Sequence, residues 1–246
     1  MKRIILLWLR NIAIFMFTFS VTSVVLFKWV PVYLTPLMLS RAIDHIADGH
    51  LPRLHHKWVS MDEISDNAAQ AVRASEDQRF LDHSGFDTEA MKQAIDEAKR
   101  GKRQRGASTI SQQTAKNVFL WNGRSWLRKG LEACFTVMIE AVWGKQRIME
   151  VYLNVAETGD GIYGIEAVSR INFNKSAKQL TEGEAALIAA TLPNPRERDS
   201  AHPTPYLRKR RAHIVKQMHN LHPWTRDLEL HGLTTDNKDA NDKSSK

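Results

Sequence analysis

The sequence predicts a mainly α-helical protein that is preceded by one membrane-spanning helix. Segments with helical periodicity and recognisable N-caps follow one another along most of the chain. No convincing run of alternating apolar and polar residues appears, and no internal repeat is visible. Near the N-terminus, the segment 12–27 contains no charged residue. The 246 residues, 43% of them hydrophobic, allow one large domain or two small ones with an ordinary core.

The apolar N-terminal segment fits a transmembrane helix over residues 11–33, because a span needs about 20 residues. Lys28 can snorkel to the interface. Lys2, Arg3 and Arg10 precede the segment, so we expect residues 1–10 in the cytoplasm and the remaining chain outside. Lys28 and Arg41 weaken this bias without cancelling it. The alternative is a cleaved signal peptide, but the apolar run is long for one and no small-x-small site follows it directly.

Residues 34–60 are expected to form a juxtamembrane linker. The polar stretch 45–57 holds four of the ten histidines, but their spacing is poor for a metal site. Beyond Met61 the pattern becomes helical, and residues 61–225 are expected to form the folded domain. Residues 226–246 form a polar tail, which we expect to be disordered.

The first helices of this domain are expected over 68–74, with Asp66 or Asn67 as the cap, and over 87–100. The basic stretch 99–105 then reads as a mobile loop, and Ser108 or Thr109 can cap the next helix. Further helices are expected over 125–143, 145–154, 162–169, 185–191 and 205–221. Thr181 and Glu184 form a capping box before the helix 185–191, which Pro193 stops.

The helix 125–143, capped by Ser125, brings six apolar residues to one face at about 100° per residue. They are Leu127, Leu131, Cys134, Phe135, Met138 and Val142. Cys134 is the single cysteine, so an intrachain disulfide is excluded, and we expect a buried core thiol and not a nucleophile.

Glu76 and Glu132 are the leading candidates for catalysis. Glu76 and its neighbour Asp77 fall at the end of a helix, where the helix dipole disfavours negative charge, so these carboxylates need another reason to be there. Sugar transfer commonly uses one carboxylate for proton transfer and a second charged group on the leaving side. Glu132 can equally be an i,i+4 partner of Arg128, and the spacing alone leaves both interpretations open.

Polar residues around these glutamates suit an anionic, oxygen-rich substrate. The formal net charge of +8 fits nucleic acid, anionic lipid or a phosphorylated substrate, and charge alone does not choose. Arginine offers phosphate a bidentate fork and lysine a point charge. His83 fits a general acid, a general base or a hydrogen-bond support for Glu76, and of these the support is expected. Phe80 is expected to pack in the core more than to stack on a substrate. The candidate substrate-binding residues are Asp77, Phe80, His83, Ser108, Thr109, Gln112, Gln113, Lys116, Asn117, Arg128 and Lys129.

At these residues the chain resembles the family 51 glycosyltransferases, the peptidoglycan polymerase domain of penicillin-binding proteins. Five ordered blocks carry the resemblance, which covers about residues 61–195. They are Glu76-Asp77 with Phe80, His83 and Gly85; residues 106–113 (GASTISQQ) with Lys116 and Asn117; Arg128-Lys129 with Glu132; residues 145–150 (KQRIME) with 152–154 (YLN); and residues 161–167 (GIYGIEA). Ala107 and Ser111 depart from the commoner glycine and threonine. No room remains for a transpeptidase after Arg196, so the chain resembles the monofunctional biosynthetic members of the family.

The resemblance implies a lysozyme-like helical lobe plus a small membrane-facing lobe, and polymerisation of lipid II. Glu76 would act as general base on the acceptor, with inversion at the donor's anomeric carbon. Glu132 with Lys116, Arg128 and Lys129 would act at the diphosphate, and undecaprenyl diphosphate would leave. No cofactor is expected to be required and no metal site is visible, although a divalent metal ion stimulates some members of the family.

The expected partners are lipid II, the growing glycan strand, the inner membrane and other cell-wall synthesis proteins, with no nucleic acid. The expected location is the bacterial inner membrane, single-pass, with the catalytic domain in the periplasm. Two alternatives are a membrane-anchored lytic muramidase, which would need no diphosphate-binding cluster, and a non-catalytic membrane-tethered scaffold. The scaffold leaves both glutamates without a role.

Overall fold

A computed structural model describes residues 2–101, 106–123 and 125–225. The tail 226–246 and most of the basic loop therefore lie outside the described residues. Within them the protein is mainly helical with a long apolar helix at its N-terminus, as predicted. The helices are α1 (Lys2–Leu26), α2 (Pro36–Ala47), α3 (Asp66–Glu76), α4 (Thr88–Lys99), α5 (Ile110–Phe119), α6 (Trp126–Val142), α7 (Gly144–Val155), α8 (Ile165–Phe173), α9 (Glu182–Thr191) and α10 (Pro205–Asn220), with short 3-10 turns η1 (Met61–Glu63) and η2 (Ala177–Gln179).

The helix starts follow the capping residues closely. Thr109 and Gln112 form a capping box at α5, Thr181 and Glu184 form one at α9, and Ser125 caps α6. Ser125 and the capping box of Thr181 with Glu184 are as predicted, although α9 begins at Glu182 and not at residue 185. Of the two caps left open for α5, the structure has Thr109. The cap of α3 is Ser65 and not Asp66 or Asn67, because the Ser65 hydroxyl accepts the Asn67 N–H.

A small three-stranded sheet was not expected from the sequence. β1 (His55–His56) pairs in parallel with β3 (Ile162–Tyr163), which pairs antiparallel with β2 (Glu157–Gly159). Strands of two or three residues are too short to show an alternating pattern. The predicted helix 162–169 accordingly begins only at Ile165. Gly164 separates strand from helix with φ +82°, and a Cβ there would lie 2.4 Å from the Asn154 carbonyl oxygen.

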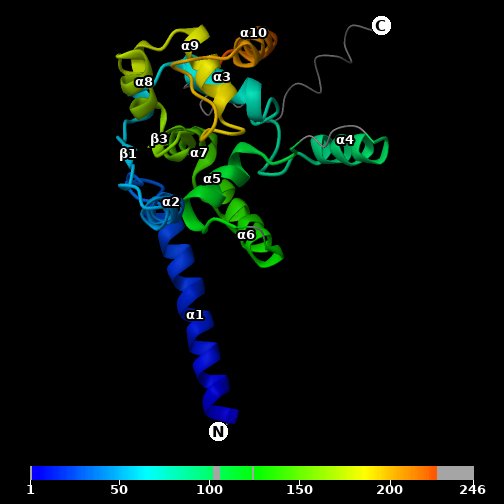
Figure 1. Ribbon diagram of the computed structural model, residues 1–246. Helices are drawn as coiled ribbons and strands as arrows, with labels where there is room; N and C mark the ends of the chain where they lie inside the picture. The colour runs from blue at the N-terminus through cyan, green and yellow to red at the C-terminus, as the bar shows by residue number, and fades with distance from the viewer. Residues whose placement is uncertain (1, 102–105, 124, 226–246) are drawn as a thin grey trace, which may run out of the picture.

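The N-terminal helix ends earlier than the predicted span 11–33. α1 is apolar from Arg3 to Leu26, with a mean hydropathy of 2.0, and projects away from the globular part (Figure 1). At the end of α1, side chains of the globular part donate hydrogen bonds to backbone carbonyl oxygens of residues 24–30. The Trp143 indole N–H donates to Val24 O at 2.7 Å, and Arg147 donates to the carbonyl oxygens of Phe27 and Val30 at 2.8 and 2.7 Å.

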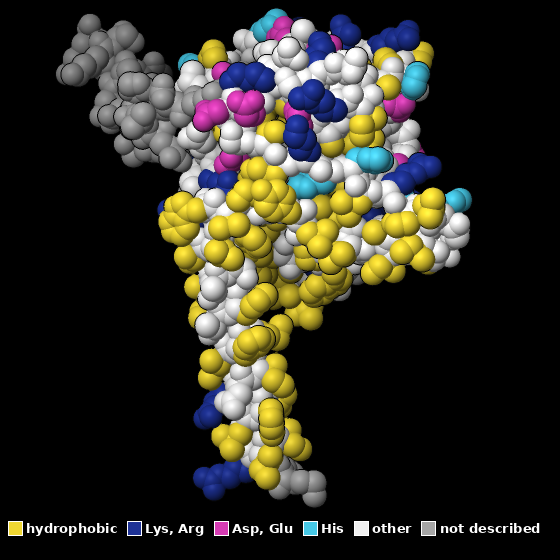
Figure 2. Space-filling view, turned by 90° about the vertical axis from the view of Figure 1, so that its left-hand side faces the viewer, with side chains coloured by type: hydrophobic (Ala, Val, Ile, Leu, Met, Phe, Trp, Pro, Cys, Tyr) yellow, Lys and Arg dark blue, Asp and Glu magenta, His cyan; other side chains and the backbone are white. Residues whose placement is uncertain are grey.

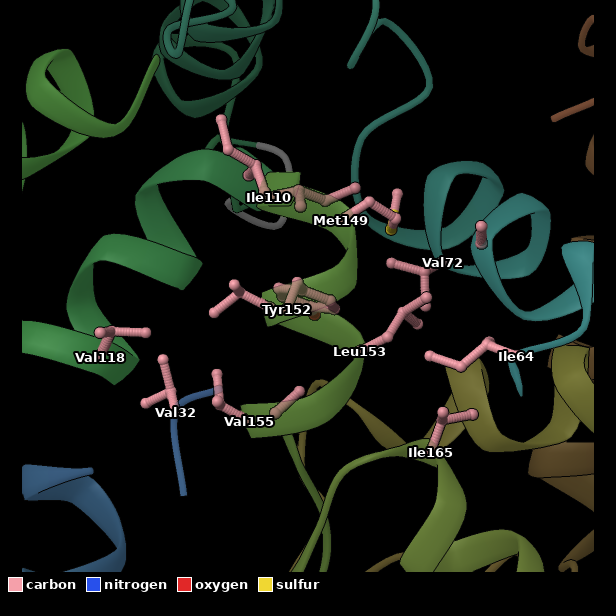
Figure 3. Packing of buried hydrophobic residues seen from close by; sticks show 14 of the residues in the cluster. Val32, Ile64, Val72, Ile110, Val118, Met149, Tyr152, Leu153, Val155 and Ile165 are labelled. Carbon is pink, nitrogen blue, oxygen red and sulfur yellow. The ribbon is translucent and has the colours of Figure 1, made fainter. Parts of the chain in front are cut away.

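The core is built around α7, which lies at the centre of the globular part (Figures 1 and 3). Ile148, Met149 and Tyr152 of α7 are almost fully buried, and Val32, Ile64 and Ile110 from distant parts of the chain join them. A second apolar cluster joins α3, α9 and α10 at the end opposite α1. Because Val24, Val32 and Met38 belong to the first cluster, the last turn of α1 and the segment after it pack against the globular part. The predicted domain boundaries stay a prediction.

The buried stripe of α6 differs from the predicted apolar face. The buried residues of α6 are Glu132, Phe135, Thr136 and Ile139. Leu131, Met138 and Val142 are partly buried, whereas Leu127 is 70% exposed. Cys134 is exposed, so the prediction of a buried core thiol is wrong. The stripe that packs against α5 is chosen by the neighbouring helices, and periodicity alone does not identify it.

Candidate active site

Glu76 is the last residue of α3, and two donors hold its half-buried carboxylate. Ser75 Oγ donates to Oε1 at 3.1 Å, and Gln113 Nε2 from α5 donates to Oε2 at 3.1 Å. The Tyr152 hydroxyl on α7 donates to Gln113 Oε1 at 3.2 Å. Burial raises the pKa of Tyr152 well above its ordinary value, and Glu76 and Asp77 raise it further, so its hydroxyl stays a donor. Three helices therefore fix one carboxylate.

Asp77 is buried and ties the end of α3 to the start of α5. Its carboxylate accepts the Ile110 N–H at 3.0 Å and lies 3.0 Å from His83 Nε2. His83 thus supports Asp77, and the predicted support of Glu76 by His83 is wrong. Phe80 is 0% exposed, with its ring 6.5 Å from that of Trp224, which fits the packing interpretation.

The residues at the start of α5 divide into caps and exposed groups. Thr109 and Gln112 are buried and use their side chains in the capping box, and the Thr109 hydroxyl also donates to Gly85 O at 2.6 Å. Ser108 is exposed. Gln113 faces Glu76, as described above. Of this predicted block, Ser108 and Gln113 therefore present polar groups toward the site.

A pocket of about 200 Å³, which we call the carboxylate pocket, opens on one side of Glu76. It is lined by residues of α3, α4 and the segments that join them to α5: Ser75, Glu76, Asp77, Gln78, Arg79, Asp87, Glu89, Ala90, Gln93, Ala94, Glu97, Gly106, Ala107, Ser108 and Thr109. Four carboxylates besides Glu76 lie in this lining, so a neutral, hydroxyl-rich group fits it better than an anion.

A larger pocket of about 520 Å³, the cationic pocket, begins at Gln113. Its lining comes from α2, α5, α6, α7 and β2 and their connections: Leu37, Arg41, Gln113, Lys116, Asn117, Leu120, Trp121, Asn122, Gly123, Arg128, Tyr152, Ala156, Glu157, Leu192, Pro193 and Pro195. Three cations against one carboxylate make it suited to an anion. The Glu76–Gln113 hydrogen bond separates the two pockets.

Glu132 anchors the cations of α6. It is 3% exposed, accepts from Arg128 Nη1 at 2.9 Å and pairs with Lys129 Nζ. The i,i+4 pair with Arg128 is therefore present, and Glu132 holds both cations, of which Arg128 lines the cationic pocket. Burial lowers the pKa of Lys116 on α5; Glu132 offsets part of that shift, and Arg128 and Lys129 lower it further. An entering anion would relieve this repulsion between cations.

Four further residues belong to this site, although the sequence analysis assigned them no catalytic or binding role. Ser75 directly precedes Glu76, and Tyr152 belongs to the block 152–154 that carries the family resemblance. Their positions in the sequence could therefore have identified both as site residues. Arg41 and Glu157 offered none, because they come from α2 and β2 and meet only in the folded chain. Among the described residues, no group of three or more His, Cys, Asp or Glu side chains could hold a metal ion.

The chain is similar to known proteins along most of its length. A sequence model of the family described as Transglycosylase matches residues 44–219. A "Biosynthetic peptidoglycan transglycosylase" of Bacteroides thetaiotaomicron is 49% identical, over 98% of this chain and 96% of that protein. Proteins of the same name from Pasteurella multocida and Pseudomonas fluorescens are 50% and 52% identical, over 85% and 82% of this chain and 85% and 84% of theirs.

Proposed function

The chain belongs to the transglycosylase family and is a peptidoglycan glycosyltransferase, and we propose that it polymerises lipid II into β-1,4-linked glycan strands with release of undecaprenyl diphosphate. The position of Glu76 is the observation that supports its assignment as the general base. Its carboxylate is held by Ser75 and Gln113 at the boundary between the carboxylate pocket and the cationic pocket. A base is needed where a hydroxyl-bearing acceptor meets a donor with an anionic leaving group.

In the proposed reaction, Glu76 takes the proton of the acceptor's GlcNAc 4-hydroxyl. The oxygen attacks the anomeric carbon of the growing strand, the donor. The bond from that carbon to the diphosphate oxygen breaks, and its electron pair leaves with the diphosphate. Attack from the face opposite the leaving group converts an α-linked donor into a β-1,4 link, so the configuration inverts.

The cations of α5 and α6 are proposed to stabilise the leaving group. Lys116 and Arg128 line the cationic pocket, and Lys129 lies beside Arg128 through their common partner Glu132. Charge that develops on the diphosphate in the transition state is stabilised by cations already in place. Glu132 is assigned to holding these cations, and not to proton transfer, because its carboxylate is buried under them.

The membrane anchor is proposed to hold the site at the bilayer surface. Hydrophobic side chains line α1 above the basic residues at its free end and continue onto the adjoining part of the globular domain, whereas the charged side chains of the globular part gather on the side farther from α1 (Figure 2). We propose that α1 crosses the inner membrane once, with its N-terminus cytoplasmic and the catalytic domain periplasmic. This placement brings the enzyme to lipid II, the growing strand and other cell-wall synthesis proteins. We still predict that the enzyme requires no cofactor and that a divalent metal ion can stimulate it.

A single pair of assays tests the proposed function. Purified full-length protein in detergent is given lipid II in one reaction and finished murein in the other. Glycan strands from lipid II, with no release of muropeptides from murein, are expected. Muropeptide release without polymerisation would establish the muramidase alternative, and inactivity on both would favour the scaffold.

A further inference from the structure

Unpartnered polar atoms concentrate in the cationic pocket. Ten buried side-chain nitrogen or oxygen atoms lack a hydrogen-bond partner within the described ranges, and four of them belong to residues that line this pocket. They are Arg41 Nε, Asn117 Oδ1, Arg128 Nε and Glu157 Oε1. Buried polar groups are normally paired, so unpaired ones gathered around one cavity indicate a polar ligand site.

Arg41 is the cation that comes from outside the catalytic part of the chain. It lies on α2, which follows the apolar helix, and it precedes the residues 44–219 that match the family. α2 is firmly placed, because Thr35 caps it at 3.2 Å from the Met38 nitrogen and Met38 is fully buried. The Arg41 side chain is 20% exposed. It is therefore a fixed part of the pocket wall.

The ion pairs of Arg41 are loose. Arg41 Nε lies 3.5 Å from Glu157 Oε2, and Nη1 lies 3.6 Å from Asp44 Oδ2. Charge-assisted hydrogen bonds are normally about 2.7–2.9 Å long. The guanidinium therefore keeps donors for a further anion. Burial raises the pKa of Glu157, although Arg41 and Arg196 lower it in part, so the charged form of this carboxylate is itself destabilised.

The same face of α2 also offers an apolar contact. Leu37 lies one turn before Arg41, and both line the cationic pocket together with Leu120 and Trp121. Hydrocarbon contacts beside three cations suit an amphiphile that carries its charge next to an apolar chain. A prenyl diphosphate has this chemistry, and α2 lies next to the apolar helix α1 in the chain.

We propose that Arg41 is a substrate-binding residue that contacts the diphosphate of the lipid-linked substrate, opposite Lys116 and Arg128, with Glu157 holding its guanidinium toward the pocket. This inference rests on the proposed function, since it names a further ligand for the same substrate. It assigns to the juxtamembrane helix a direct part in binding, in addition to membrane attachment.

Kinetics of full-length variants in detergent test the proposal. Arg41→Ala is expected to raise KM for lipid II by about tenfold or more, the effect of losing a charge-assisted contact. Arg41→Lys should recover part of the loss, because it restores the charge without the fork. Arg53→Ala is the matched control. Arg53 carries the same charge in the same region and pairs with Asp160 at 3.3 Å, but it is 64% exposed and does not line the pocket.

Binding of inorganic diphosphate, followed by the thermal shift of each variant, separates this inference from the proposed function because it needs no turnover. Wild type and Arg53→Ala should be stabilised alike and Arg41→Ala less. Glu157→Gln should be stabilised at least as much as wild type, because the glutamine amide oxygen can still accept from the Arg41 guanidinium while the negative charge next to the diphosphate is lost. If the wild-type protein binds diphosphate through Arg41 but makes no glycan, the proposed function is wrong, whereas the contact between Arg41 and diphosphate stands.

Arg41→Ala with the wild-type KM and the wild-type diphosphate shift would overturn the role of Arg41. If that variant also loses sedimentation with anionic liposomes, Arg41 contacts lipid headgroups instead. A purely structural role would lower the melting temperature of Arg41→Ala and Arg41→Lys alike while leaving their diphosphate shifts unchanged.

Discussion

Gln113 Nε2 lies 3.1 Å from Glu76 Oε2 and joins the start of α5 to the end of α3. The Tyr152 hydroxyl donates to the other end of the same amide, so the NH₂ group must face the carboxylate. Ser75 and Gln113 thereby hold Glu76 in one orientation, and no ion pair joins it to a cation among the described residues. An oriented carboxylate within reach of a hydroxyl is what general-base catalysis requires.

Glu76→Gln is expected to abolish polymerisation while leaving folding and lipid II binding largely intact. Glutamine has nearly the same shape but cannot accept the hydroxyl proton, and general-base catalysis contributes about 10²- to 10⁴-fold. Glu63→Gln is the control, since Glu63 is exposed and lines neither pocket. Glycan synthesis from lipid II measures both, and a Glu76→Gln variant near the wild-type rate would remove Glu76 from its proposed role.

Lys116→Ala and Arg128→Ala should each lose activity, and Arg128→Lys should lose less than Arg128→Ala. Losing a charge-assisted phosphate contact costs about 1.5–3 kcal/mol, and lysine restores the charge but not the bidentate geometry. Steady-state turnover of lipid II measures the effect, with Lys209→Ala on the exposed face of α10 as the control. Normal turnover by both alanine variants would contradict the assignment of the cationic pocket to the diphosphate.

Truncation at two positions should separate the anchor from the docked segment. Deletion of residues 1–20 removes most of the exposed apolar helix, so we expect a folded protein that is active in detergent but works poorly on lipid II in bilayers. Deletion of residues 1–40 also removes the buried side chains of Val24, Val32 and Met38, so it should lower stability as well.

Thermal unfolding and sedimentation with anionic liposomes across a salt series measure both truncations. Binding that remains after deletion of residues 1–20 should weaken with salt, because it would depend on basic side chains. Equal stability of the two truncated proteins would contradict the role of the docked segment in the core. Retention on liposomes at high salt would instead indicate an apolar membrane-inserting surface on the catalytic domain.

Glu166→Gln should make the free energy of unfolding less sensitive to acid. Glu166 is 2% exposed and accepts from Ala177 N at 2.7 Å and from Arg170 and Lys57 at 2.9 and 3.3 Å. Burial alone would raise the pKa of Glu166, but these donors bring it below its ordinary value. The carboxylate therefore stabilises the fold above the unfolded-state pKa of about 4.3, and this contribution is lost as the pH falls through the folded-state pKa.

Near neutral pH the Glu166→Gln variant should be less stable by about 1.5–3 kcal/mol, the usual effect of hydrogen bonds to a charged group. The difference from wild type should shrink toward acid pH. Urea unfolding over a pH series measures it, with the exposed Glu63→Gln as the control. A difference that grows in acid would contradict the sign of the pKa shift.

Local signals in the sequence predicted the helices well because capping is a short-range interaction. Thr109 with Gln112 and Thr181 with Glu184 bond within one turn, so the residues that begin α5 and α9 can be read directly. The same holds for Ser125 at α6. The position of Glu76 at a helix end was also visible in the sequence, and it was enough to make this residue a leading candidate for catalysis.

Tertiary packing decided which side of a helix is buried and which distant residues meet. Cys134 is exposed because α5 covers the stripe of α6 that carries Glu132 and Ile139, a choice that periodicity cannot make. Arg41 and Glu157 are far apart in sequence and become partners only when α2 docks beside β2. The sequence by itself therefore determined the catalytic candidates and most of the helices, but not α2, which lies within the stretch 34–60 that was expected as a linker. The fold alone assembled the second half of the cationic pocket, because long-range contacts leave no local pattern.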